Sequence, residues 1–130
     1  MILKKPVQKG GLTWSLFKGG SKYNARKTEY NGVLYHSTLE ARYAQYLDTL
    51  LRAKKILSWD RQIRIPLIVN GVKVCVYVMD FVYTKPNKEV VWVEVKGAET
   101  QTWKLKWKIL KALYPDRTLE LVRREDLAHV

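Results

Sequence analysis

The amino-acid sequence predicts an α/β or α+β layer sandwich. Three observations support this class: a helical pattern early in the chain, a β-rich centre, and a second helical pattern followed by one more strand. The chain has 130 residues, of which 47% are hydrophobic. That length suits one compact core and leaves little room for a second. We therefore expect one domain over residues 31–130, preceded by an N-terminal segment.

Residues 1–30 are predicted to form a basic arm. This segment carries seven cations against the single acid Glu29, and two Gly-Gly pairs interrupt any regular pattern. Residues 12–17 are too apolar for a purely disordered arm and favour a short strand, packed on its own core or, as a less favoured alternative, on a partner. The basic residues of the arm are Lys4, Lys5, Lys9, Lys18, Lys22, Arg26 and Lys27.

A short hairpin and a helix are expected next. Asn31-Gly32 is typical of a tight hairpin turn between residues 29–30 and 33–35. Ser37 is a suitable N-cap, and Glu40 stands at the third helical position, which is the capping-box arrangement. Apolar residues then recur at helical spacing, so the helix should run to about Lys55.

The centre of the chain predicts three strands. Residues 63–69 and 72–83 are β-branched runs joined by Asn70-Gly71, and Pro66 indicates an edge strand or a bulge. A turn over residues 84–89 leads to a strand over 90–96. Thr100 or Thr102 then caps a helix that runs through Tyr114, and residues 118–122 form the last strand.

The charge of the chain indicates a polyanionic partner. Its 24 Lys and Arg against 12 Asp and Glu give a net charge of +12, which favours nucleic acid. No long uncharged apolar run is present, so no membrane association is expected. Cys75 is the only cysteine, which suits the reducing cytoplasm and rules out an internal disulfide and a thiolate-rich zinc site. Any metal should therefore have oxygen ligands.

The strongest candidate site combines Asp80 with Glu94 and Lys96. Glu94 and Lys96 are two apart on a strand and therefore share a face. If the preceding turn centres near Asn87, Asp80 lies opposite Glu94 with Cβ atoms about 4.5–5.5 Å apart. Two carboxylates at that distance repel by about 3 kcal/mol, which a divalent cation would reverse. The alternative is an ordinary ion-pair cluster in which Lys96 neutralises both acids.

Two patterns bear on this choice. Asp80 shares its strand face with the valine row Val72, Val74, Val76, Val78 and Val82, and an acid in an apolar row is more suspicious than one on a polar face. The second helix carries lysines along one side and Trp103, Trp107, Leu110 and Tyr114 along another. The aromatic stripe suits the core. For the lysines, a solvated face and a phosphate-binding face are equally favoured. These are Lys104, Lys108 and Lys111.

These residues resemble the PD-(D/E)-x-K nuclease superfamily. The pattern here is Val78-Met79-Asp80, thirteen intervening residues, and then Glu94-Val95-Lys96. Met79 stands in place of the proline of the superfamily pattern. Over about residues 21–122 the chain is similar to a phage-encoded family of small proteins related to junction-resolving and transposase-type endonucleases. Gln62 also matches that family's pattern. The resemblance implies a restriction-endonuclease-like core, a mixed β-sheet flanked by helices.

The resemblance also implies an activity. Asp80 and Glu94 would ligate Mg²⁺ or Mn²⁺, with the Val95 carbonyl and Glu40 as further ligands, and Lys96 would assist the attacking water. The Glu40 role conflicts with its capping-box role. We expect a metal-dependent DNA endonuclease (a hydrolase) of phage type, acting in DNA recombination, repair or processing, with a homodimer as one possibility. The alternative is a DNA-binding module without catalysis. The expected DNA contacts are Lys22, Arg26, Lys27, Lys104, Lys108 and Lys111.

Overall fold

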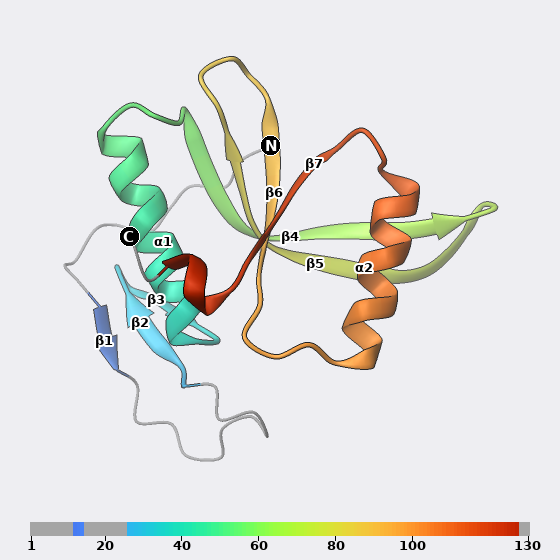
Figure 1. The fold of residues 1–130 in the computed structure, drawn as a ribbon, viewed down its shortest axis with the longest axis horizontal. Coiled ribbons are helices and arrows are strands. Elements are labelled where there is room, and N and C mark those ends of the chain that lie inside the picture. Colours follow the sequence, from blue (N-terminus) through green and yellow to red (C-terminus); the bar gives the residue numbers. More distant parts are fainter. Residues whose placement is uncertain (1–11, 15–25, 128–130) are drawn as a thin grey trace.

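The computed structural model describes residues 12–14 and 26–127 and has the α+β architecture expected (Figure 1). The fold has a three-stranded antiparallel sheet, a four-stranded mixed sheet and two long helices; α1 packs against both sheets, and α2 packs against the four-stranded sheet. In chain order the elements are β1 (Leu12–Trp14), β2 (Thr28–Tyr30), β3 (Val33–Tyr35), α1 (Thr38–Arg52), β4 (Ser58–Val69), β5 (Val72–Thr84), β6 (Val90–Val95), α2 (Gln101–Leu113), β7 (Thr118–Val122) and a short 3-10 helix (Arg124–Leu127).

The small sheet has the order β1-β2-β3 and contains the predicted hairpin. Asn31 and Gly32 both have positive φ, at 52° and 78°, as the tight turn requires. Thr28 and Tyr30 are buried, so the last residues assigned to the arm belong to the folded domain. The expected strand within residues 12–17 forms at β1 and pairs with β2 of the same chain. The rest of the arm, including Lys22, lies outside the described residues.

Helix α1 begins as predicted and ends three residues early. The Ser37 hydroxyl accepts a hydrogen bond of 3.1 Å from the Glu40 N–H, so Ser37 is the N-cap. The helix stops at Arg52 because Lys54 has a positive φ of 58°. The N–H groups of Lys54 and Lys55 turn back to the carbonyls of Leu51 and Leu50, which satisfies the last turn of the helix.

Strands β4 and β5 form one long hairpin around the predicted Asn70-Gly71 turn. Pro66 lies on the edge strand β4, and a register shift follows at Leu67, as the proline indicated. The valine row that shares its strand face with Asp80 is not uniformly buried. Val72 and Val74 are 62% and 54% exposed, because the tip of the hairpin extends past the helices (Figure 1), whereas Val82 is buried.

The two halves of the long hairpin pack into two different hydrophobic cores. Figure 1 shows β4 and β5 changing direction midway. Between the Arg61–Phe81 and Ile63–Met79 pairs, Gln62 on β4 has no partner in the strand register and has a positive φ of 56°. Before the bend, Met79 packs in the core beneath α2. After it, Phe81 packs in the core beneath α1. Asp80 therefore lies between residues of the two cores, and it is half-buried.

Strand β6 completes the mixed sheet. It pairs antiparallel with β5 and parallel with β7, which follows α2. All six residues of β6 except Val90 are buried, so its one acid, Glu94, is held in a largely apolar strand. Helix α2 starts at the predicted Thr100 cap, whose hydroxyl accepts a hydrogen bond of 3.1 Å from the Trp103 N–H. The segment between β6 and α2 brings the start of α2 beside Glu94.

Candidate functional site

A cavity of about 450 Å³ lies where the bend of β4 and β5, the end of β6 and the start of α2 meet. Asp80, Glu94 and Lys96 all line it, so the structure brings the three predicted residues together. Gln62, at the bend of β4, also lines it. The cavity is therefore the candidate functional site.

The Asp80 and Glu94 positions follow from the turn between β5 and β6. Phe81 pairs with Val93 and Thr84 with Val90, so the turn centres on residue 87, as predicted. Continuing the register by one residue places Asp80 opposite Glu94. Asp80 Oδ2 accepts a hydrogen bond of 2.9 Å from the Val95 N–H. This bond fixes the Asp80 carboxyl where the pairing of β5 with β6 ends. Val95 therefore contacts the site through its main chain.

Glu94 is 4% exposed and has a partner for each carboxyl oxygen. The Tyr77 hydroxyl donates a hydrogen bond of 2.7 Å to Oε1, and Lys96 Nζ lies 3.4 Å from Oε2. The Lys96 ammonium also lies 4.9 Å from the centre of the Trp103 ring. The ion-pair alternative is thus correct for the Glu94–Lys96 contact, and Lys96 still faces the cavity.

Glu40 approaches the same acids from α1. It is buried, and its Oε1 atom has no hydrogen-bond partner among the described residues, so this oxygen does not complete a capping box. Burial and the nearby Glu94 charge raise the pKa of Glu40 to about 7. A buried polar atom without a partner is costly. Burial therefore disfavours the ionised form of the Glu40 carboxyl.

The other two carboxyls also have raised pKa values. Burial and the charges of Glu40 and Glu94 raise the pKa of Asp80 well above its ordinary value. Burial also raises the pKa of Glu94, against the opposing influence of the Tyr77 hydrogen bond and the Lys96 charge. Three carboxyls thus share a region in which they cannot all be ionised without a compensating positive charge.

The candidate ligands have the right chemistry for a hard divalent cation, but their side chains are not fully arranged around one metal position. The predicted side-chain ligands Asp80, Glu94 and Glu40 all offer carboxyl oxygens, and one of these, Glu40 Oε1, is buried with no hydrogen-bond partner among the described residues. Within residues 26–127, however, no three His, Cys, Asp or Glu side chains already surround a single point. Asp80 and Glu94 point to the cavity, while Glu40 does not line it. For Glu40 to be a further ligand of a metal bound there, its side chain would have to rotate toward the cavity.

Several cavity residues were not identified from the sequence. Tyr77 links Glu94 to Trp103, because its hydroxyl also accepts a hydrogen bond of 2.8 Å from the Trp103 indole N–H. Lys106 and Thr102 line the cavity from α2, and His36 lines it from the segment before α1. The i,i+4 spacing of Thr102 and Lys106 was the one available signal, since it places both on one side of the helix.

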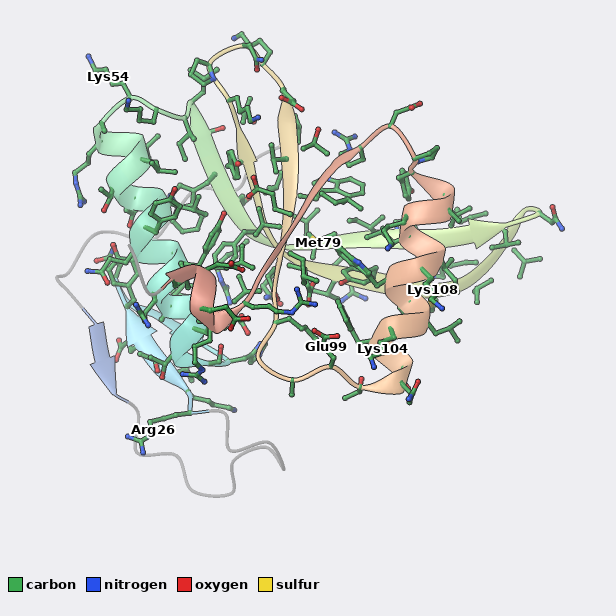
Figure 2. The ribbon with its side chains drawn as sticks, in the orientation of Figure 1. Arg26, Lys54, Met79, Glu99, Lys104 and Lys108 are labelled. Atoms are coloured by element: carbon green, nitrogen blue, oxygen red, sulfur yellow. The ribbon has the colours of Figure 1, made fainter. Side chains whose placement is uncertain are left out.

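The lysines predicted to bind phosphate lie elsewhere on α2. Lys104, Lys108 and Lys111 line a separate groove of about 490 Å³. Figure 2 shows Lys104 and Lys108 on α2, with Glu99 in the segment before it. Arg26 and Lys27 are exposed next to β2, and Figure 2 shows Arg26 far from α2. The structure therefore separates these cations from the carboxylate cavity and leaves Lys106 as the α2 lysine inside it.

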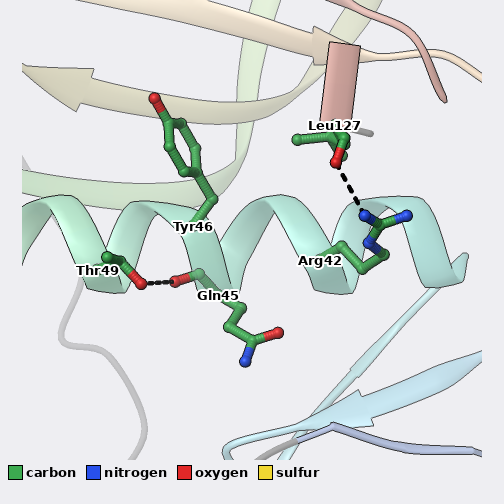
Figure 3. A pocket seen from close by; sticks show the side chains of 5 residues that line it. All are labelled: Arg42, Gln45, Tyr46, Thr49 and Leu127. Atoms are coloured by element: carbon green, nitrogen blue, oxygen red, sulfur yellow. Dashed lines mark hydrogen bonds between the residues drawn. The ribbon is translucent and has the colours of Figure 1, made fainter. Parts of the chain in front are cut away.

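A smaller cavity of about 210 Å³ lies between α1 and the 3-10 helix (Figure 3). Arg42 on its wall donates a hydrogen bond of 2.9 Å to the Leu127 carbonyl, and the Thr49 hydroxyl donates one of 3.1 Å to the Gln45 carbonyl. No acid lines this cavity. Its contacts attach the end of the described chain to α1, which is a structural role.

Among the described residues, neither α1 nor α2 has the length and apolar character needed to cross a membrane.

Comparison with known proteins gives a family without an assigned activity. No curated protein and no solved structure matches the chain. One family model matches residues 20–127, a range that includes every candidate site residue. The chain therefore belongs to the family described as protein of unknown function DUF1064.

Proposed function

We propose that this chain is a metal-dependent endonuclease that hydrolyses phosphodiester bonds in DNA. The observation that carries the proposal is that Asp80 and Glu94 line one cavity together with Lys96, while the buried Glu40 carboxyl lies close enough to raise the pKa of Asp80. Such a cluster raises its own pKa values and is unfavourable unless a cation is bound. The net charge of +12 supports a polyanionic substrate.

Asp80 and Glu94 would hold Mg²⁺ or Mn²⁺, with Glu40 and the Val95 carbonyl as the further candidates. When bound, such an ion polarises a phosphoryl oxygen and acidifies a water molecule. The chain prepares the donors for this role. The Val95 N–H orients Asp80, and the Tyr77 hydroxyl orients Glu94, so neither carboxyl is free to rotate away.

The cations of the cavity would act on the phosphate. Lys96 is held between Glu94 and the Trp103 ring, and from there it can orient the attacking water and offset negative charge on the transition state. Lys106 faces the same cavity and can bind a neighbouring phosphate oxygen. By resemblance, water attack would leave a 5′-phosphate and a 3′-hydroxyl.

The biological setting remains part of the proposal. The superfamily resemblance favours a phage-type enzyme of DNA recombination, repair or processing in the host cytoplasm. Cutting both strands of a junction would need two such cavities, which a homodimer would provide.

A second candidate is a DNA-binding module without catalysis. The observation that favours it is that Glu94 is already neutralised by Lys96, while Glu40 does not line the cavity. In that case the carboxyls would serve only the fold. The basic surfaces would bind DNA in the same way under both candidates, so binding alone does not distinguish them.

Cleavage of labelled duplex, junction and single-stranded DNA in Mg²⁺, Mn²⁺ or EDTA tests the proposal. We expect cleavage in Mg²⁺ or Mn²⁺ and none in EDTA. Asp80→Asn removes one metal ligand charge at constant volume, and Lys96→Ala removes the cation. Each should lower the cleavage rate by at least about a hundredfold, as loss of one strong electrostatic contact does.

Matched controls come from exposed residues of the same types. Asp116→Asn and Lys88→Ala change the same charges outside the cavity, and both residues are exposed. They should cleave at the wild-type rate. DNA binding by the wild-type protein without metal-dependent cleavage of any of these substrates would contradict the endonuclease proposal and support the second candidate.

A further inference from the structure

A basic groove runs between α2 and the end of β7, separate from the carboxylate cavity. It has a volume of about 490 Å³, within the range of ligand sites. Lys104, Lys108 and Lys111 line one side, and Leu121 and Arg123 lie across from them. We call this the α2–β7 groove. Trp103 lines both this groove and the carboxylate cavity, so the two sites share a wall.

The charge of the groove suits a phosphate backbone. Lys104, Lys108 and Lys111 follow i, i+4 and i+7 spacing and are exposed on one side of α2. The acid that lines the groove, Glu99, is already paired with Arg123 at 2.8 Å. No ion pair within residues 26–127 involves the three lysines. Three positive charges therefore remain available along about two turns of helix.

The groove also contains an aromatic surface. The Trp107 ring stacks on Trp103, with ring centres 5.6 Å apart and planes 25° apart, and it contacts the Tyr77 ring at 6.0 Å. These contacts hold the indole in one orientation while it remains only half-buried. Leu105, which also lines the groove, is 60% exposed. A fixed indole beside cations is the arrangement that binds unpaired bases by stacking.

We propose that the α2–β7 groove binds single-stranded nucleic acid, with Trp107 stacking on an unpaired base and Lys104, Lys108 and Lys111 binding phosphates. A duplex does not fit this role, since its bases already stack on one another. The inference rests on the proposed endonuclease function for the fate of the bound strand. Because Trp103 joins the groove to the carboxylate cavity, the preferred substrate is DNA with a single-stranded branch or flap near the cleavage point.

Binding is tested without cleavage, in EDTA, with the Asp80→Asn variant of the whole chain. The probes are a fluorescent oligothymidylate of about ten nucleotides, a duplex of equal length, and an abasic oligodeoxynucleotide with the same phosphates. Fluorescence anisotropy should show about tenfold or greater preference for the oligothymidylate over the abasic strand. The abasic comparison needs no change at Trp107, so it stays valid if aromatic variants fold poorly.

Two variants then separate stacking from charge. Trp107→Leu should weaken oligothymidylate binding about tenfold or more, and abasic-strand binding less than about twofold. Changing Lys104, Lys108 and Lys111 together to Gln should weaken both and reduce the salt slope by about 2. Lys54→Gln, Lys55→Gln and Lys88→Gln together change three exposed lysines outside the groove and should have a smaller effect.

The outcomes distinguish this inference from the function on which it rests. Equal affinity for the oligothymidylate and the abasic strand would overturn the stacking site, even if the wild-type protein cleaves DNA. Equal loss of binding in the two triple-lysine variants would overturn the groove as the binding surface. Base-dependent binding in the groove without metal-dependent cleavage would support this site and contradict the endonuclease proposal alone.

Discussion

The Tyr77 hydroxyl donates a hydrogen bond of 2.7 Å to Glu94 Oε1 across the bend of the large sheet. The same hydroxyl accepts a hydrogen bond of 2.8 Å from the Trp103 indole, so it joins the candidate ligand to α2. Burial and the Glu94 charge raise the pKa of Tyr77, which keeps the phenol neutral and able to donate. Tyr77 is therefore a positioning residue for Glu94, and its removal should affect both stability and metal binding.

Tyr77→Phe should lower the free energy of unfolding by about 1.5–3 kcal/mol, because it removes a buried hydrogen bond to a charged acceptor. It should also raise the Mg²⁺ concentration needed to stabilise the protein, since Glu94 loses its orientation. Urea denaturation with and without Mg²⁺ measures both effects. Tyr83→Phe is the matched control, because Tyr83 donates a similar bond of 2.9 Å to Glu120 on the α1 side. Tyr83→Phe should lower stability and leave the Mg²⁺ requirement unchanged; an equal change in both variants would contradict the positioning role.

The metal-free protein should become less stable as the pH rises from about 4.5 through about 7. The pKa of Glu40 in the folded chain is raised to about 7 from its ordinary 4.5, so the folded state holds a proton that the unfolded chain releases. The protonated Glu40 carboxyl stabilises the fold fully below pH 4.5, its ordinary pKa. This stabilisation is lost as the pH rises through about 7, its pKa in the folded chain. The loss is on the order of 3 kcal/mol.

Thermal denaturation in EDTA across this pH range measures that effect. Glu40→Gln should flatten the profile and stabilise the metal-free protein above pH 7, because the amide carries no charge to bury. Glu125→Gln changes an exposed acid and should leave the profile as in the wild type. A wild-type stability that rises over the same pH window would show that the Glu40 carboxyl is favourably ionised in the folded state, contrary to this prediction.

Mg²⁺ should raise the melting temperature of the wild type at pH 8, and less at pH 5.5, where protons compete for the same carboxyls. At a hundredfold excess over the dissociation constant the stabilisation is about 2.7 kcal/mol. Asp80→Asn should abolish it. The same variant should melt higher than the wild type in EDTA, because it relieves repulsion from Glu40 and Glu94. Equal Mg²⁺ stabilisation of Asp80→Asn and wild type would remove Asp80 from the set of ligands.

Asp48 stabilises the α1 side of the fold rather than the candidate site. Its carboxyl accepts hydrogen bonds from the Tyr30 hydroxyl at 2.7 Å, the Asn31 amide at 3.1 Å and the Trp59 indole at 3.0 Å. Asp48→Ala should lower the free energy of unfolding by about 3 kcal/mol, because it leaves buried donors without an acceptor. Chemical denaturation compares it with Asp116→Ala on the surface, and a difference below about 0.5 kcal/mol would contradict this role.

Local chemistry explains why much of the fold was predictable. Asn31-Gly32 and Asn70-Gly71 each adopt the positive φ angles that a two-residue hairpin turn needs, so the turn type and the pairing follow from two adjacent residues. Ser37 and Thr100 cap their helices through bonds that reach only three residues along the chain. These interactions form within one element or between neighbours, and tertiary packing does not need to be known.

The opposition of Asp80 and Glu94 was likewise determined by the sequence. A turn centred on residue 87 sets the register of the two strands, and the alternation of side chains sets the shared face of Glu94 and Lys96. The end of α1 was less predictable. Lys54 takes a left-handed conformation that is usually assigned to glycine, so the stop at Arg52 had no strong local signal.

Only the tertiary structure decided what surrounds that pair. The bend at Gln62 turns the two halves of the hairpin toward different cores, which brings Tyr77 beneath α2 and leaves Asp80 at an opening. The orientation of α2 about its own axis decides which lysines meet which site. Lys106 lies in the cavity, and the predicted lysines Lys104, Lys108 and Lys111 lie in the neighbouring groove. Sequence spacing specifies which residues share a side of a helix or strand. Which neighbour that side meets depends on sheet twist and on the packing of distant residues, and these are set by the whole core at once.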